Sequence, residues 1–336
     1  MPAMAADRLP CVREAAAEEL PGLIAGGAEP FVVRALVRDW PLVQAGLASA
    51  ASARDYLADR SRAVDVPYSV VPPGEGGRLF YDAAMAVNFR MASGRLRDVL
   101  AAFGGAEEAE RPTVYLGSID IHRYFDGLHQ ANHVAAVPED ALASIWIGHA
   151  TRIAAHNDHP RNLACCAVGQ RRFTLFPPDQ FANLYLGPLD VTPAGRSVSL
   201  VDFDAPDFTR HPRYREALAH AQVAQLEPGD ALFIPSLWYH HVDATAPFNV
   251  LVNYWWRDTP RWLGQPQTAM THAIMAIRDL PESERAIWRE MFEHYVFSGG
   301  EDARAHLPEA GRGILGPIDA ATAQRIHQFL LRSLSQ

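Results

Sequence analysis

The strongest constraint on the fold is a run of short segments, rich in β-branched and aromatic residues, between residues 112 and 257. Glycine, proline and aspartate separate these segments at short intervals. Such spacing is typical of an antiparallel sandwich or barrel. We predict eight short strands, which is about the number that a jelly roll requires. They cover residues 113–116, 144–147, 152–156, 162–168, 171–176, 231–234, 238–242 and 249–255.

The two flanks have different textures. Residues 1–111 mix helix and strand signals, with a strand predicted at 30–37 and an amphipathic helix at 95–103, and should pack on the barrel as an α/β region. Residues 258–336 carry apolar residues at helical spacing, so we predict a C-terminal helical region. The expected fold class is therefore mainly β with α additions, a double-stranded β-helix or jelly-roll core with helical N- and C-terminal regions.

Composition narrows the functional classes. The chain carries 30 basic and 39 acidic residues, and its net charge of −9 would repel a phosphate backbone. Three cysteines, two of them adjacent at Cys165 and Cys166, provide neither a disulfide framework nor a paired metal-binding motif. Charges stand in residues 1–8, where a signal peptide would be apolar, and no stretch of about 18 apolar residues occurs. We expect a cytoplasmic protein with no nucleic acid or membrane partner.

A histidine and an aspartate, His156 and Asp158, stand two residues apart at the end of a predicted strand. Side chains two apart on a strand share a face, so the imidazole and the carboxylate should converge. Farther along, a Gly-Asp turn, a strand and a proline precede two adjacent histidines, His240 and His241. A returning strand of this kind can supply a third ligand, and two histidines with one carboxylate form the facial triad of non-haem Fe(II) oxygenases. Strand parity alone does not decide between His240 and His241.

The same tripeptide pattern occurs a second time, at His241 and Asp243. With 14 histidines and 39 acidic residues among 336, one or two such matches are expected by chance. A lone histidine on a strand is more often a packed or surface residue than a metal ligand. The metal interpretation therefore depends on the surrounding residues.

Arg171 provides the second argument. It alternates with Phe173 and Leu175, which places its guanidinium on the inward face of a predicted strand. A buried guanidinium needs a partner, because burying an uncompensated charge is costly. The partner is either the carboxylate of a small acid, which suits the planar fork of arginine, or an internal aspartate or glutamate.

These residues follow one another in the order of a known family. The pattern consists of His156-x-Asp158, Asn162, the stretch from Gly169 and Arg171 to Gln180, Gly229-Asp230, Pro235, His240-His241-Val242 and Val252-Asn253-Tyr254-Trp255. As a whole it resembles the Jumonji-C, cupin-like hydroxylases, among them the asparaginyl hydroxylase that acts on hypoxia-inducible factor and its bacterial cupin-like relatives. The resemblance covers residues 112–256 and extends to the flanks in layout only.

The resemblance implies a metal centre and a reaction. Fe(II) would be held by His156, Asp158 and His240, because the first histidine of the pair binds the metal in that family. The implied cosubstrates are 2-oxoglutarate and O2, with succinate and CO2 released as a C–H bond is hydroxylated. Asp158 favours hydroxylation, since halogenating relatives have a small residue in its place. The implied substrate is a protein or peptide side chain, followed by a small molecule.

The resemblance also implies a cosubstrate pocket. Arg171 stands where the family usually has a lysine that binds the distal carboxylate of 2-oxoglutarate, and Tyr115 stands where a tyrosine hydroxyl assists it. Asn162 and Asn253 match polar residues that line this pocket. Ile153 replaces a threonine of the asparaginyl hydroxylase that also contacts the distal carboxylate. We predict that Thr151, two residues earlier on the same face, takes over this contact.

Two alternative functions fit the same residues. One is a non-redox cupin that binds another metal as an isomerase or hydrolase, and the other is a catalytically silent binding module. Residues 183–226 form a long insert between the two halves of the metal site, which covers the mouth of the active site or is a packed excursion with a strand at 197–201 and a helix at 213–219. The C-terminal helices form a homodimer interface or cap the barrel.

Overall fold

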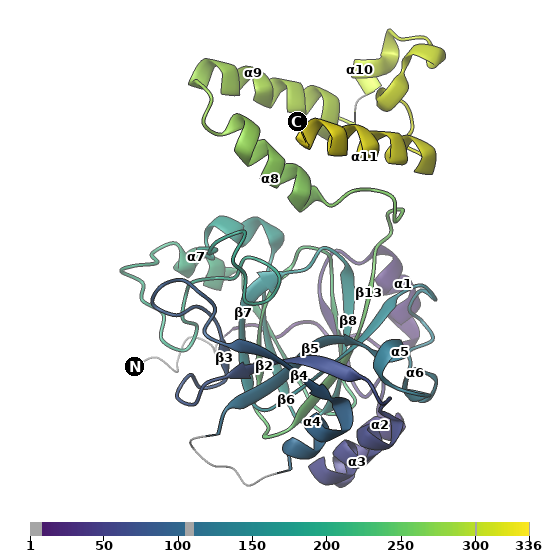
Figure 1. Cartoon of the computed structure of the whole chain (residues 1–336), viewed down its shortest axis with the longest axis vertical. Helices are drawn as coiled ribbons and strands as arrows, with labels where there is room; N and C mark the ends of the chain where they lie inside the picture. Colours follow the sequence, from purple (N-terminus) through teal and green to yellow (C-terminus); the bar gives the residue numbers. More distant parts are fainter. Residues whose placement is uncertain (1–8, 105–110, 300, 336) are drawn as a thin grey trace. The chain divides into compact units, whose positions relative to one another are not determined.

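The computed structural model describes residues 9–104, 111–299 and 301–335 of the chain. Residues 1–8, on which the expectation about a signal peptide rests, lie outside the described residues. The chain divides into two compact units, one ending at Arg257 and the other beginning at Asp258. Each unit is described by itself below (Figure 1).

The described residues of the first unit form thirteen strands, which lie in two sheets. The larger sheet has the order β1-β11-β8-β13-β6-β5-β2-β4, and the smaller has the order β10-β9-β12-β7-β3. All pairings are antiparallel except that of β3 with β7. The strands are β1 (Phe31–Val33), β2 (Asp65–Val71), β3 (Arg78–Leu79), β4 (Arg90–Arg95), β5 (Thr113–Asp120), β6 (Leu142–Gly148), β7 (Thr151–Asn157), β8 (Arg161–Val168), β9 (Arg171–Phe176), β10 (Gln222–Leu226), β11 (Ala231–Ile234), β12 (Tyr239–Ala244) and β13 (Asn249–Trp256).

Helices flank the sheets of the first unit and make up most of the second. In the first unit they are α1 (Leu20–Gly26), α2 (Pro41–Ala48), α3 (Ala50–Arg60), α4 (Leu96–Ala102), α5 (Ile121–Tyr124), α6 (Leu128–Ala131) and α7 (Tyr214–Ala219). In the second they are α8 (Pro266–Ile277), α9 (Glu282–Phe292), α10 (Glu301–Ala305) and α11 (Ala320–Leu334). Local signals start several of them: a proline opens α2, and the side chain of Ser49 accepts the Ser52 N–H at the beginning of α3.

The predicted jelly roll is confirmed. From β6 to β9 and again from β11 to β13, consecutive strands enter the two sheets alternately. This winding pairs strands that are distant in the sequence, so that β12 lies between β7 and β9, and β13 lies between β6 and β8. Two strands separated by more than 80 residues therefore become neighbours at the centre of the smaller sheet.

Two layers of apolar packing hold the larger sheet. Alternate residues of its strands face outward and pack with helices α2, α3 and α4, which lie next to one another (Figure 1). The intervening residues face inward, between the two sheets. The adjacent Cys165 and Cys166 illustrate the alternation, because both are fully buried free thiols but belong to different layers. The inward layer surrounds the cavity described below.

Several predicted elements differ from the observed ones. The strand expected at 30–37 ends at Val33, because the chain turns at Ala35, whose φ is +53°. The strand expected at 197–201 is reduced to a single bridge at Ser199, since the hydroxyls of Ser197 and Ser199 donate to backbone carbonyls of the insert. The predicted helices at 95–103 and 213–219 are observed as α4 and α7.

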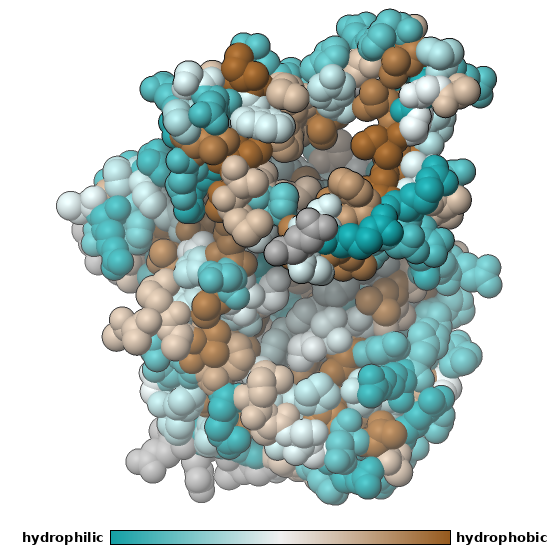
Figure 2. All heavy atoms as spheres, turned by 45° about the horizontal axis from the view of Figure 1, so that its top comes forward, coloured by the Kyte–Doolittle hydropathy of each residue, from teal (hydrophilic) through white to brown (hydrophobic). Residues whose placement is uncertain are grey.

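The second unit has very few buried side chains. No residue of α8 or α9 is buried, and in α10 and α11 only Ala303 and Thr322 are. Apolar side chains therefore remain at its surface, where Figure 2 shows them in brown. None of the described helices of either unit has the length and hydropathy needed to cross a membrane.

Asp230 fastens the turn between β10 and β11 to the end of β1. Its carboxylate pairs with Arg34 at 2.7 Å and accepts the N–H groups of Ala35 and Glu227 at 2.9 and 3.1 Å. The side chain is only 10% exposed, so the charge depends on these donors. The contact fixes the beginning of the segment that leads through β11 to β12.

We predict that Asp230→Ala lowers the free energy of unfolding by about 2–4 kcal/mol, because three donors lose a buried charged acceptor. Urea unfolding followed by circular dichroism measures the change. Asp65→Ala is the control: it removes the exposed ion pair of Asp65 with Arg95 and should change the free energy by less than about 1 kcal/mol. Equal effects of both substitutions would contradict the proposed importance of the Asp230 contact.

Candidate metal centre and cavity

The end of β7 and the beginning of β12 carry the three predicted ligands. His156 is the penultimate residue of β7, Asp158 follows the end of this strand, and His240 is the second residue of β12. The antiparallel register places His240 directly opposite His156. The N–H of Leu237, just before β12, donates to the carbonyl oxygen of Asp158 at 2.8 Å, which ties the two strand ends together.

A β-bulge in β7 sets the orientation of His156. His156 lies opposite His240 and Ile153 lies opposite Val242, so three residues of β7 span the distance of two residues of β12. The extra residue restores a common face for His156 and Ile153 despite their odd spacing, and both line the same cavity. Bulges occur next to active sites because they redirect individual side chains.

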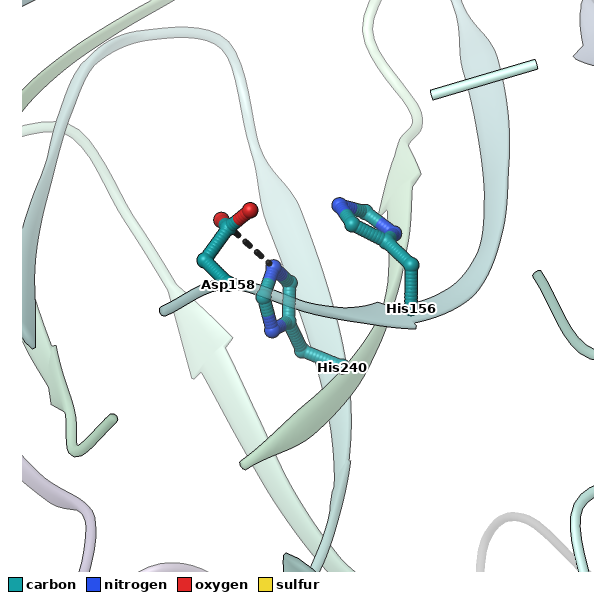
Figure 3. Close-up of side chains that lie close together, drawn as sticks. All are labelled: His156, Asp158 and His240. Carbon is teal, nitrogen blue, oxygen red and sulfur yellow. Dashed lines mark ion pairs between the residues drawn. The ribbon is translucent and has the colours of Figure 1, made fainter. Parts of the chain in front are cut away.

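The three side chains converge on one point (Figure 3). One ligand atom of each of His156, Asp158 and His240 lies within 4.8 Å of the others. The two imidazole rings have centroids 4.5 Å apart, and Nε2 of His240 is 3.7 Å from Oδ2 of Asp158. Nδ1 of each histidine lies at hydrogen-bond distance from a backbone carbonyl, that of Ala154 at 2.9 Å and that of Trp238 at 3.1 Å. These contacts place the proton on Nδ1 and leave both Nε2 atoms free to bind a metal.

Burial keeps His240 neutral. The loss of solvent lowers its pKa to about 4; the nearby His156 lowers it further, and Asp158 acts in the opposite direction. A neutral imidazole is the form that ligates metals. Two imidazoles and one carboxylate, held at this spacing, fit a divalent cation of the Fe(II) type.

His241 lies on the other face of β12. Its ring stacks on Phe203 with centroids 4.6 Å apart, and its Nε2 is 3.1 Å from the carboxylate of Asp243. His240 thus joins the cluster and His241 does not, a choice that strand parity left open. The second His-x-Asp pattern of the sequence is a local pair beneath the insert.

A cavity of about 500 Å³ opens between the two sheets beside the cluster. Arg171 lines it from β9 and Tyr115 from β5, and both are nearly fully buried. The Tyr115 hydroxyl and the guanidinium are hydrogen-bonded, and burial raises the pKa of Tyr115 to about 12, so the hydroxyl keeps its proton. Desolvation lowers the pKa of Arg171.

Arg171 has no carboxylate partner among the described residues. The groups that act on its pKa are Tyr115 and Cys166, and its buried Nε has no hydrogen-bond partner. The internal aspartate or glutamate considered from the sequence is therefore not found in this part of the chain. A guanidinium in such surroundings fits the carboxylate of a small acid bound in the cavity.

Asn162 and Asn253 lie on the adjacent strands β8 and β13 and also line the cavity. The amide of Asn253 donates to the Asn162 side-chain oxygen at 3.2 Å and accepts the indole N–H of Trp146 at 2.8 Å. This chain of hydrogen bonds fixes the orientation of both amides next to the metal cluster.

The comparison with protein families agrees with this geometry. The cupin-like domain family matches residues 17–261, most of the chain. The chain belongs to the cupin-like domain family. The Jumonji-C, cupin-like resemblance is thus confirmed, and this family has Fe(II)- and 2-oxoglutarate-dependent oxygenase members.

Three curated proteins illustrate the similarity. The chain is 34% identical over 121 residues, 35% of its length, to the lysine-specific demethylase JMJ31 of Arabidopsis thaliana. It is 32% identical over 145 residues, 42% of its length, to tRNA wybutosine-synthesizing protein 5 of Danio rerio. It is 31% identical over 153 residues, 43% of its length, to the human HSPB1-associated protein 1. The matches span 22%, 41% and 30% of the lengths of these relatives, respectively.

Thr151 departs from the predicted cupin-like pocket. It is buried at the first position of β7, in the register row of Arg171, with Ala244 of β12 between the two. It is not among the residues that line the cavity, whereas Ile153 is. The side of the pocket that Thr151 was expected to make polar is therefore apolar, and Arg171 and Tyr115 remain to bind an acid.

The outer wall of the cupin-like cavity comes from β2, from the stretch of residues 87–91 that runs into β4, and from the insert. The insert was one of the elements expected at the mouth of the site, whereas sequence reasoning missed β2 and residues 87–91. A second missed feature is the irregularity in β5, where Gly117 and Ser118 interrupt the register and Ser118 has a φ of +49°. A glycine inside a strand could have indicated it. Both residues line the cavity.

The low pKa of His240 generates a prediction for metal binding to this cupin-like site. An ordinary histidine binds protons below about pH 6.5 and loses its metal there. Because burial holds the pKa of His240 at about 4, protonation of His240 should weaken Co(II) binding only as the pH falls toward 4. Isothermal titration calorimetry measures the affinity.

The matched controls are His240→Ala and His241→Ala. The first should abolish Co(II) binding and the second should leave it unchanged, since His241 faces away from the cluster. The opposite result would show that the cluster is not the metal site.

Proposed function

We propose that the protein is an Fe(II)- and 2-oxoglutarate-dependent dioxygenase that hydroxylates a C–H bond of a protein or peptide side chain, releasing succinate and CO2. The observation that supports this function best is the combination of a His-Asp-His cluster with a buried arginine that has no carboxylate partner, both lining one cavity. A metal alone would need only the cluster. The arginine adds a reason for an acidic cosubstrate.

Each proposed role follows from the chemistry of the side chain. His156, Asp158 and His240 hold Fe(II), and the bound iron supplies the one-electron and O2 chemistry that amino acid side chains lack. Arg171 and Tyr115 bind the distal carboxylate of 2-oxoglutarate, the first through charge and the second as a protonated donor. These side chains are buried between the two sheets, which keeps bulk water away from most of their surface.

Asn162 and Asn253 complete the proposed cosubstrate pocket. Their side chains are held by each other and by Trp146, so they offer fixed polar groups at small cost in side-chain entropy. Fixed groups of this kind orient a bound acid relative to the metal. The non-redox alternative would use the same arginine for an acidic substrate, and anaerobic turnover without 2-oxoglutarate would identify it.

The proposed role of Arg171 is tested by Arg171→Met, assayed as succinate formation by the Fe(II)-loaded enzyme. The KM for 2-oxoglutarate should rise by roughly 100-fold, because losing a buried charged donor costs about 2–5 kcal/mol of binding. Arg172→Gln is the matched control, since the neighbouring side chain points to the other face of β9. His156→Ala and Asp158→Ala should abolish succinate formation.

A second measurement separates binding from folding. Arg171 has no carboxylate partner to lose, so Arg171→Met should leave the melting temperature unchanged or raise it. A normal KM in Arg171→Met, or equal KM values for both arginine variants, would contradict the proposed cosubstrate site. Full succinate formation by the ligand variants would contradict the function itself.

We also propose that the C-terminal unit pairs with a second copy of the chain. Its amphipathic helices expose large apolar side chains to solvent. Phe329 and Leu330 of α11 are 61% and 44% exposed, and Ile287 of α9 is 56% exposed. An isologous interface places such a face against its own copy, which buries both. A second copy is the partner present in every preparation of the protein.

This assembly predicts a dimer in multi-angle light scattering after size-exclusion chromatography. Phe329→Glu combined with Leu330→Glu should shift the mass to that of a monomer, because charges would enter an apolar interface. Leu47→Glu, at an equally exposed position of α2, is the control and should leave the mass unchanged. A monomeric wild-type protein at about 10 μM would rule out the dimer.

A further inference from the structure

The cavity also constrains the substrate. We infer that the enzyme acts on an uncharged, apolar side chain of a peptide or protein segment and rejects side chains that carry an ammonium group or a carboxylate. This inference rests on the proposed function and adds the chemical class of the group that enters the site.

The charges that line the cavity are all accounted for. They belong to His156, Asp158, His240 and Arg171, which are the proposed metal and cosubstrate ligands. Every other lining residue within the described chain is apolar or carries only a hydroxyl, amide or indole group. An additional charged group would therefore meet no opposite charge that is not already used.

The outer wall of the cavity is mostly apolar. Tyr68 comes from β2, Val87 and Phe89 precede β4, Met91 lies in β4, and Ala194 comes from the insert. Phe89 and Ala194 pack against the inward apolar layer of the barrel. A hydrocarbon group that enters here exchanges water for apolar surface on several sides, which favours its binding.

A charged side chain would be penalised at the same place. Burying an ammonium or a carboxylate without a partner is unfavourable, and the wall offers neither an acid nor a base. The hydroxyl of the lining residue Ser69 is uncharged, and it already donates a hydrogen bond to the sulfur of Met91. The wall therefore selects against lysine, arginine, aspartate and glutamate.

The rim of the cavity points to a peptide segment as the occupant. Val87 and Met91 line the cavity but are also 36% and 62% exposed, so apolar surface continues from the cavity to the outside. Val191 of the insert, next to the lining residue Thr192, is exposed as well, and its carbonyl accepts the Tyr81 hydroxyl at 2.7 Å. Exposed apolar patches around a pocket mark protein-binding sites, because a free metabolite would leave them uncovered.

The test uses synthetic peptides that share a host sequence of alanine, glycine and serine and differ in one central residue. Norleucine and lysine are the decisive pair, because both side chains have four carbons in a line and only lysine ends in an ammonium. Leucine, phenylalanine and glutamate complete the set. The holoenzyme with Fe(II), 2-oxoglutarate and O2 is assayed for succinate above the rate without peptide and for a 16 Da mass increase of the peptide, about that of one oxygen atom.

We expect the norleucine peptide to raise succinate formation and to gain an oxygen, with a kcat/KM at least about tenfold above that of the lysine and glutamate peptides. Equal or higher kcat/KM for lysine or glutamate would overturn the inference. Equal turnover of N-acetylnorleucine amide would show a small-molecule substrate and overturn its peptide part. No response to any peptide, with normal succinate formation in their absence, would overturn the inference and leave the proposed function intact.

A charge placed in the wall provides the matched test of mechanism. Ala194→Asp adds a carboxylate at a half-buried loop position, and Thr192→Asp does so at a second lining position. Either variant should raise the kcat/KM of the lysine peptide relative to norleucine by about tenfold or more, because the ammonium gains a partner. Leu47→Asp on α2 is the control and should leave the ratio unchanged. An unchanged ratio in both wall variants would overturn the inference that the wall selects the side chain. If the wild-type enzyme formed no succinate under any condition, the result would instead contradict the proposed function.

Discussion

The antiparallel pairing of β7 with β12 is the contact on which the site depends. It sets His240 against His156 although 83 residues separate the two positions in the chain, and the bulge in β7 places His156 on the face that lines the cavity. Backbone carbonyls then fix both Nδ1 atoms. A one-residue slip would bring His241 inward, beside a carboxylate that now faces His240. The register between β7 and β12 thus determines which histidine of the pair joins the cluster.

Arg171 shows how the fold accepts a local cost for a site. Its guanidinium is almost completely buried, hydrogen-bonds Tyr115 and has no carboxylate partner within the described chain. Burying such a charge opposes folding, so the apolar layers around it must more than compensate. Positions that violate the rules of stability in this way are expected where a ligand supplies what the protein lacks.

The strands of the barrel could be predicted from the sequence more fully than the features that depend on strand pairing. Eight strand segments followed from alternation and turn residues, because these signals are local and the inward face of each strand repeats every two residues. The bulge that aligns Ile153 with His156, and the position of Thr151 away from the cavity, follow from pairing with β12, which no window of sequence contains. The choice of His240 over His241 also depends on strand pairing, so the sequence analysis could make it only from the family resemblance. The strand expected at 197–201 is reduced to a single bridge, and the hydroxyls of Ser197 and Ser199 donate to carbonyls 10 and 15 residues away in the insert, contacts that a sequence window does not show.

The chemistry and the selectivity of the site arise from different parts of the chain. The proposed metal and cosubstrate residues stand on strands of the barrel or directly after one, whereas Tyr68, Met91 and Ala194 stand on segments outside the eight predicted strands. Since the proposed reaction uses every charged side chain that lines the cavity, substrates would be distinguished by the shape and polarity of this outer wall. Changes there need not disturb the ligands. Cupin-like relatives matched over 121–153 residues carry names as different as lysine-specific demethylase JMJ31 and tRNA wybutosine-synthesizing protein 5.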